Sequence, residues 1–173
     1  MKSKQPKKNK AGKSGGRMQA TRVSEKARKE ATRGPAKKLP EPKVCPECKA
    51  TYRDGRWVWP AVANPTGTPV LCPACERIRE RRPAGEVRIT GEFAAAHRDE
   101  ILARARHVEE REKREHPLQR IMAVAEQAGE TVVTTTDPHL AHAIGTALHD
   151  AFKGELSAPY GEKGELARVR WTR

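Results

Sequence analysis

The chain has 173 residues, which allows one or two small domains with a modest core. Only 36% of its residues are hydrophobic, 33% are charged, and the net charge is +13. The charge is uneven, because the first 44 residues hold fifteen Lys and Arg against three Asp and Glu, a net of +12, and the remainder carries a net of +1. A basic segment joined to a near-neutral body is typical of proteins that meet a polyanion.

Neither a secretion signal nor a membrane span is predicted. The first forty residues contain only scattered apolar side chains, and no later segment has the apolar length that a bilayer requires. We therefore expect a cytoplasmic protein without a membrane partner. In that compartment thiols stay reduced, and paired cysteines bind metal more often than they form disulfides.

Residues 1–43 are predicted to form a disordered basic tail. Lys, Gly, Ser and Pro dominate this segment, and it has too few apolar groups to offset the entropy lost on ordering. We interpret the tail as a contact for nucleic acid phosphates, and a merely solubilising tail is the alternative. The tail residues expected to bind nucleic acid are Lys7, Lys8, Lys10, Lys13 and Arg17.

Residues 44–82 contain all four cysteines, in two Cys-Pro-x-Cys pairs. Cys45 and Cys48 form the first pair, Cys72 and Cys75 form the second, and 23 residues separate the pairs. A two-residue spacing lets both sulfurs reach one ion from a tight turn, and two such turns complete a closed tetrahedral site. The spacing therefore predicts a zinc ribbon with one structural ion.

Two alternatives to zinc remain open for these cysteines. Iron is the minority alternative for the metal, because the same doublet occurs in rubredoxin-type sites. Two redox couples or plain buried thiols are the alternative to any metal. Lys49 and Glu76 follow the two pairs, at positions where the usual ribbon turn has Gly.

Two tryptophans lie between the pairs, in the run "GRWVW". The alternation of a strand puts Trp57 and Trp59 on one face, where they could stack on unpaired bases with Arg53 and Arg56 beside them. The alternative is that these rings form the core of a tiny domain.

Behind the second pair, "ERIRERR" predicts a short helix or extension. Arg77, Arg81 and Arg82 are interpreted there as phosphate contacts, and a solvated charged helix is the alternative.

Residues 83–173 are predicted to form an α+β domain. The pattern predicts a strand over 86–90, a helix over 92–115, strands over 118–127 and 131–136, a helix over 137–154, and a closing strand pair over 155–160 and 165–171. This order, β-α-β-β-α-β with one extra strand, indicates a ferredoxin-like fold. Right-handed crossovers would put both helices on one face of an antiparallel sheet.

Catalytic motifs are not found. The run "HRDE" at residues 97–100 lies inside a helical pattern and lacks the other kinase motifs. His139 and His142 lie three apart with no third ligand in place, and helix capping explains "VVTTTDPH" without a phosphate. We therefore expect a protein that is not an enzyme, and we assign no catalytic residue.

Several runs resemble a known family across roughly residues 44–173. They are "CPECKATYRDGRWVW", "LCPACERIR", "PAGEVRITGEF", "HRDEI", "EHPLQRIM", "VTTTDPHLAHAIGTAL", "KGEL" and "RVRW". They resemble a family of small bacterial proteins that are often labelled as similar to the nonsense-mediated-decay-type adaptor of the archaeal and eukaryotic large ribosomal subunit. The resemblance implies a ribosome-bound factor in which the four cysteines hold zinc. The adaptor has further cysteine pairs and domains, so only metal binding and ribosome association carry over.

These observations predict a zinc-ribbon RNA-binding protein. Its expected partners are ribosomal RNA, on the large ribosomal subunit, and ribosomal proteins, and its expected role is in assembly, stability or dormancy. A DNA-associated transcriptional factor is one alternative, although no recognition helix is evident. A protein–protein adaptor that binds through its sheet or helices is the other.

Overall fold

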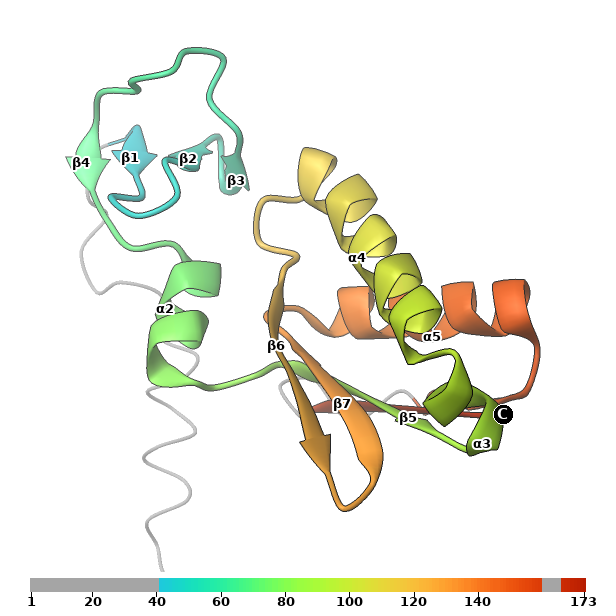
Figure 1. Ribbon diagram of the computed structural model, residues 1–173. Helices are drawn as coiled ribbons and strands as arrows, with labels where there is room; N and C mark the ends of the chain where they lie inside the picture. Colours follow the sequence, from blue (N-terminus) through green and yellow to red (C-terminus); the bar gives the residue numbers. More distant parts are fainter. Residues whose placement is uncertain (1–40, 160–165) are drawn as a thin grey trace, which may run out of the picture. The chain divides into compact units, whose positions relative to one another are not determined.

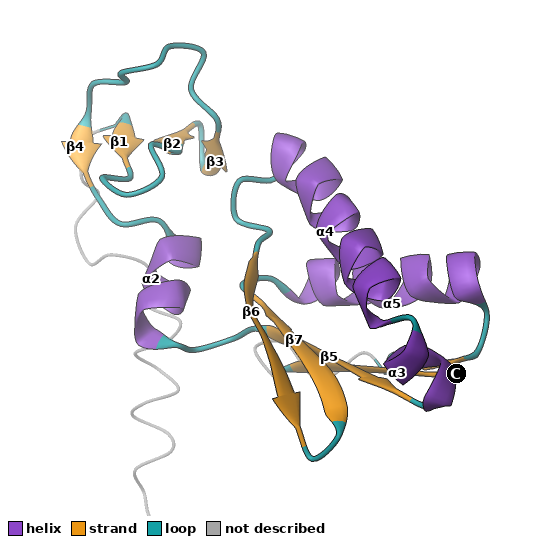
Figure 2. Ribbon diagram, viewed as in Figure 1, coloured by secondary structure: helices purple, strands orange, loops and turns teal. Residues whose placement is uncertain are grey.

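The structure is a computed structural model, and it describes residues 41–159 and 166–173 (Figure 1). These residues belong to one compact unit, Leu39–Arg173. They form a mixed α+β structure with four helices and two small sheets (Figure 2). Residues 1–40 lie outside the described part, and so do the predictions for Lys7, Lys8, Lys10, Lys13 and Arg17. None of the described helices has the length and apolar character needed to cross a membrane.

The first sheet is built from four very short strands in the order β3-β2-β1-β4. The strands are β1 (Lys43–Val44), β2 (Thr51–Arg53), β3 (Arg56–Val58) and β4 (Thr68–Pro69). Strand β1 pairs antiparallel with β2 and parallel with β4. The helix α2 (Pro73–Glu80) follows directly. We call this sheet with α2 the ribbon, and it holds all four cysteines.

The second sheet has five strands in the order β6-β7-β5-β9-β8. In chain order its elements are β5 (Gly85–Thr90), α3 (Glu92–Ala96), α4 (Arg98–Glu115), β6 (Ile121–Gln127), β7 (Glu130–Thr135), α5 (Pro138–Phe152), β8 (Glu155–Ser157) and β9 (Ala167–Thr172). The predicted antiparallel sheet is wrong at one pair, because β9 runs parallel to β5. The reason is that β8 occupies the edge, and the chain then turns back so that β9 lies between β8 and β5.

The helix predicted over 92–115 is interrupted at His97. Its backbone there has φ −115° and ψ 27°, which ends α3 and begins α4. The His97 ring stacks on Phe93 with 4.1 Å between centroids, and the backbone N–H of Ala94 donates to the carbonyl of Arg173 at 3.2 Å. The short helix α3 therefore stays in contact with the C-terminal end of the chain beside β9, and α4 can run in a different direction.

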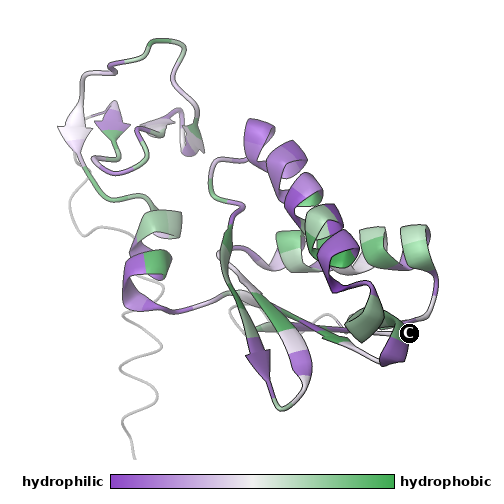
Figure 3. Ribbon diagram, viewed as in Figure 1, coloured by the Kyte–Doolittle hydropathy of each residue, from purple (hydrophilic) through white to green (hydrophobic). Residues whose placement is uncertain are grey.

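A hydrophobic core lies between the five-stranded sheet and the two long helices, which cover the same face (Figure 2). Burial alternates along β5 and β9, as expected for strands with one covered face. Trp171 is fully buried in this core, and its indole N–H donates to the carbonyl of Lys153 at 2.7 Å. Figure 3 shows that α5 is mostly apolar, whereas α4 is mostly polar, with only one stripe buried.

We predict that Gly145→Ala destabilises the protein even though Ala favours helix by about 1 kcal/mol over Gly. A Cβ at Gly145 would lie 2.5 Å from Cγ1 of Val169, so α5 would have to move off β9. Overpacking of this kind costs about 1–3 kcal/mol. We expect thermal unfolding, followed by circular dichroism, to begin at a temperature about 5 °C lower. The exposed neighbour Thr146→Ala is the matched control and should not lower it. A more stable Gly145→Ala protein would show that the close packing is absent.

Candidate metal centre

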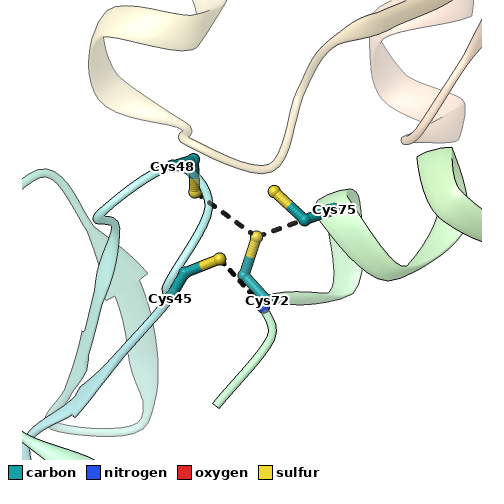
Figure 4. Close-up of side chains that lie close together, drawn as sticks. All are labelled: Cys45, Cys48, Cys72 and Cys75. Carbon is teal, nitrogen blue, oxygen red and sulfur yellow. Dashed lines mark hydrogen bonds between the residues drawn. The ribbon is translucent and has the colours of Figure 1, made fainter. Parts of the chain in front are cut away.

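The four cysteines, 24 to 30 positions apart between the pairs, meet in one cluster (Figure 4). All four Sγ atoms lie within 4.8 Å of one another. Cys45, Cys72 and Cys75 are buried, and Cys48 is half-buried. Across residues 41–159 and 166–173, this is the one group of Cys, His, Asp or Glu side chains placed to hold a metal ion. The predicted clustering is confirmed.

The first pair lies on a tight turn after β1. The N–H of Cys45 donates to the carbonyl of Ala50 at 2.9 Å, and the N–H of Lys49 donates to the carbonyl of Cys45 at 3.0 Å. Lys49 has φ 66°, the left-handed conformation that Gly most easily adopts. Its Nζ donates to the carbonyl of Pro46 at 2.9 Å. The turn therefore forms with Lys in the position where Gly is usual.

The second pair begins a helix and does not form a second tight turn. Cys72 is the N-cap of α2, Pro73 occupies the first turn, and the N–H of Cys75 donates to Sγ of Cys72 at 3.4 Å. Because Glu76 continues the helix, no left-handed residue is needed after this pair. The N–H of Cys72 also donates to Sγ of Cys45 at 3.4 Å, which joins the two pairs.

The sulfurs fit one tetrahedrally bound ion. A Zn–S bond of about 2.3 Å implies sulfurs about 3.8 Å apart. The Sγ atoms of Cys48 and Cys72 are 3.6 Å apart, far beyond the length of a disulfide, and all four cysteines are free. Four sulfurs would fill all positions of such an ion and leave none for a catalytic water. The arrangement is compatible with a single, closed metal site.

The close approach of the sulfurs shifts the pKa values of the thiols in opposite directions. The pKa of Cys48 is lowered to about 4, chiefly because the thiol of Cys72 donates a hydrogen bond to it. The same contact, together with burial, raises the pKa of Cys72, and burial raises the pKa of Cys75 to about 12. The cluster therefore retains protons at neutral pH unless a cation takes their place, as metal binding requires.

The two tryptophans have different surroundings. Trp57 packs against the cysteine cluster, and its ring centroid lies 5.6 Å from that of Tyr52. Trp59 lies just beyond β3, where its indole N–H donates to the carbonyl of Lys113 at 2.6 Å. Both rings are half-buried, which agrees with the packing alternative. Base stacking by either ring stays a prediction.

The arginines predicted to contact phosphate lie on two parts of the ribbon. Arg53 and Arg56 are exposed and face each other across the β2–β3 hairpin. The others are at the end of α2. Arg77 is half-buried and donates to the carbonyl of Arg82 at 3.4 Å, Arg81 is the exposed C-cap, and Arg82 pairs with Glu80 at 2.6 Å.

Two residues beside the cluster were not predicted from the sequence. Leu118 packs against the cysteines, and Nη1 of Arg120 lies 3.4 Å from Sγ of Cys75. Both belong to the loop between α4 and β6, so they come from outside the cysteine segment. Arg120 lies 45 positions from Cys75 in the sequence, so no local sequence spacing could have predicted that the two are in contact.

Comparisons of this chain with protein-family models, with curated proteins and with solved structures found no match. The description of the site therefore rests on the residues of the chain itself.

We predict that the purified protein binds one thiophilic metal ion per chain and that Cys72→Ser abolishes tight binding. Cys72 contacts the three other cysteines, so its loss removes a ligand and two hydrogen bonds to sulfur (Figure 4). The affinity should fall by more than the about 10–100-fold that loss of an outer partner costs. Elemental analysis and competition with a chelator measure this, and the exposed change Thr66→Ser is the control. Full metal content in Cys72→Ser would contradict the four-sulfur site.

We also predict that Lys49→Gly stabilises the ribbon. An L-residue in the left-handed region costs about 1–2 kcal/mol, and Gly avoids this strain. Part of the gain is lost because Gly has more backbone freedom in the unfolded chain. The metal-loaded variant should therefore be more stable to denaturant by up to about 1 kcal/mol. Lys49→Ala is the comparison, because it keeps the strained backbone and loses the contact with Pro46. A glycine variant less stable than the alanine variant would show that relief of the backbone strain does not decide the stability.

Proposed function

We propose that this protein is a zinc-binding, RNA-binding factor that associates with the ribosome, on its large subunit, in the cytoplasm. Ribosomal RNA is the main partner in this proposal, and ribosomal proteins are further contacts. The zinc ion has a structural role, and the protein acts in assembly, stability or dormancy of the subunit.

The observation that carries the proposal is the distribution of charge. The first 44 residues have a net charge of +12, and Lys43 and Val44 at their end are already the first strand of the ribbon. The basic segment is therefore continuous in sequence with the sheet that presents the first cysteine pair. Each lysine or arginine that neutralises a phosphate releases a counterion, and this release supplies much of the affinity for a polyanion.

The exposed arginines of the ribbon add to this. Arg53, Arg56, Arg79 and Arg81 are exposed, and none of them has a carboxylate partner within the described part of the chain. Unpaired guanidinium groups can donate two parallel hydrogen bonds to a phosphate. They extend the cationic character of residues 1–44 onto a folded surface.

Zinc fits the role of a folding ion here. The buried cluster of the ribbon consists of Cys45, Cys72, Cys75 and Ala74, and its strands have two or three residues each. Such strands cannot hold together by themselves. A structural zinc ion contributes about 10–16 kcal/mol in small peptides, which would supply most of the stability of this part.

The five-stranded sheet has a place in the same proposal. We interpret β5, β6, β7 and β8, with α4 and α5, as a split β-α-β, ferredoxin-like arrangement into which β9 is inserted. The resemblance to the ribosomal adaptor stays a prediction, and it is the reason for preferring the ribosome over other RNA.

The test is cosedimentation of the full chain with separated ribosomal subunits at increasing salt. We expect binding to the large subunit that weakens with salt, because each phosphate contact contributes about 0.7 to the slope of log affinity against log salt. A variant that keeps the chain length carries Gln at five positions and should lower the slope by about 3.5. The five positions are Lys7, Lys8, Lys10, Lys13 and Arg17.

Two outcomes would overturn the proposal. One is an RNA affinity that does not change with salt or with the five substitutions. The other is equal affinity for duplex DNA and no preference for the ribosome, which would favour the transcriptional alternative.

A further inference from the structure

Arg120 belongs to the α4–β6 loop, yet its guanidinium lies among the cysteines of the ribbon. The residue is only 8% exposed, and Nη1 is 3.4 Å from Sγ of Cys75. A buried charge costs several kcal/mol unless a counter-charge faces it. No carboxylate forms an ion pair with Arg120 in the described residues. The nearby groups able to carry negative charge are therefore the cysteine sulfurs.

The side chain is fixed independently of any ion. Nε donates to the carbonyl of Pro117 at 2.7 Å, within the same loop. Two hydrogen bonds with Thr136 hold the backbone of Arg120. The N–H of Arg120 donates to Oγ1 of Thr136 at 2.9 Å, and the N–H of Thr136 donates to the carbonyl of Arg120 at 2.9 Å. The guanidinium also lies over the ring of Trp59, 5.6 Å from its centroid. These contacts orient the guanidinium toward the sulfurs in advance.

One donor of this guanidinium is unused. Nη2 is buried, and no acceptor among residues 41–159 and 166–173 forms a hydrogen bond with it. A buried donor without an acceptor is destabilising, so the arrangement is complete only when another acceptor develops there. The Sγ of Cys48 lies within 4.8 Å of the Sγ of Cys75 that Nη1 contacts, so it is close to the same guanidinium.

Metal binding would create the missing acceptor. Four thiolates around one divalent cation carry a net charge of −2, and thiolates accept hydrogen bonds more strongly than thiols do. Cys48 belongs to the first pair and Cys75 to the second, so one guanidinium can reach both pairs.

We propose that Arg120 is the fifth member of the metal centre, donating N–H groups to the thiolates of Cys48 and Cys75 in the metal-loaded protein. The inference rests on the metal binding proposed above. Its consequence is that the ion fastens the ribbon to the α4–β6 loop, and through Thr136 to the end of β7. Metal binding then also stabilises the contact between the ribbon and the five-stranded sheet, because an ion that binds only when the two are joined favours the joined state.

The test compares Arg120→Met and Arg120→Lys with the wild-type chain, each loaded with Co²⁺. Met has similar length and no charge, whereas Lys keeps the charge with a single compact donor group. We expect chelator competition to show metal binding about 10–100-fold weaker in Arg120→Met, with Arg120→Lys between it and the wild type. A role in packing alone would not give this order.

The spectrum of bound Co²⁺ is the second measurement. Hydrogen bonds lower the energy of the sulfur lone pairs, so their loss should move the sulfur-to-cobalt charge-transfer band to longer wavelength in Arg120→Met. In the protein loaded with diamagnetic Zn²⁺, the amide NMR signal of Thr136 should shift on metal removal in the wild type and not in Arg120→Met. Arg79→Met, which removes the same charge from an exposed position on α2, is the matched control and should change neither the band nor the affinity.

The outcomes separate the two proposals. A wild-type chain that binds no metal overturns both of them. A wild-type chain that binds metal, with an unchanged band and affinity in a folded Arg120→Met, overturns only the role of Arg120. If Arg120→Met does not fold, the same comparison is made with Arg120→Lys, and a wild-type band and affinity there overturn the role equally.

Discussion

The ribbon depends on one electrostatic constraint, which is that four sulfur atoms share a space less than 5 Å across. All four Sγ atoms lie within 4.8 Å of one another, and three of the cysteines are buried. Four thiolates so close together would repel one another strongly, and four thiols would leave polar groups poorly matched in a small interior. A divalent cation removes both difficulties, because it replaces protons with charge at the centre of the group. The strands around the cluster have only two or three residues each, and strands this short add little stability of their own.

The five-stranded sheet is held by a different force. Val87, Val133 and Val169 lie side by side on neighbouring strands, and Trp171 fills the end of the same layer. This burial of apolar surface is of the ordinary kind that stabilises small domains. On the metal binding proposed here, one chain combines a part stabilised by an ion with a part stabilised by apolar packing. The loop that carries Leu118 and Arg120 connects the two, because it begins after α4, contacts the cysteines, and ends in β6.

The sequence predicted what depends on local spacing and missed what depends on distant contacts. The cysteine pairs and the start of α5, where Asp137 accepts from the N–H of His139 at 2.8 Å, follow from neighbours in the chain. The break at His97 does not, since it accompanies a contact between α3 and Arg173. Strand alternation indicates which face is buried but not which strand is adjacent, so the parallel pairing of β9 with β5 could not be foreseen. Strand β6 begins three residues later than predicted because the residues before it are committed to the cysteine cluster.

Arginine has three distinct roles in this chain, and burial and pairing decide between them. On the sheet face opposite the helices, Arg88 and Arg170 both form ion pairs with Glu130, at 3.0 and 3.4 Å. Their positive charge is therefore largely neutralised within the protein. Arg120 is buried against sulfur, and we propose that its charge serves the metal centre. Arg53 and Arg56 are exposed on the ribbon hairpin without a carboxylate partner in the described residues. A net charge of +13 does not by itself locate a surface for RNA. The surface that we propose for RNA is that of the unpaired arginines on the ribbon, whose first strand follows the basic segment in the sequence.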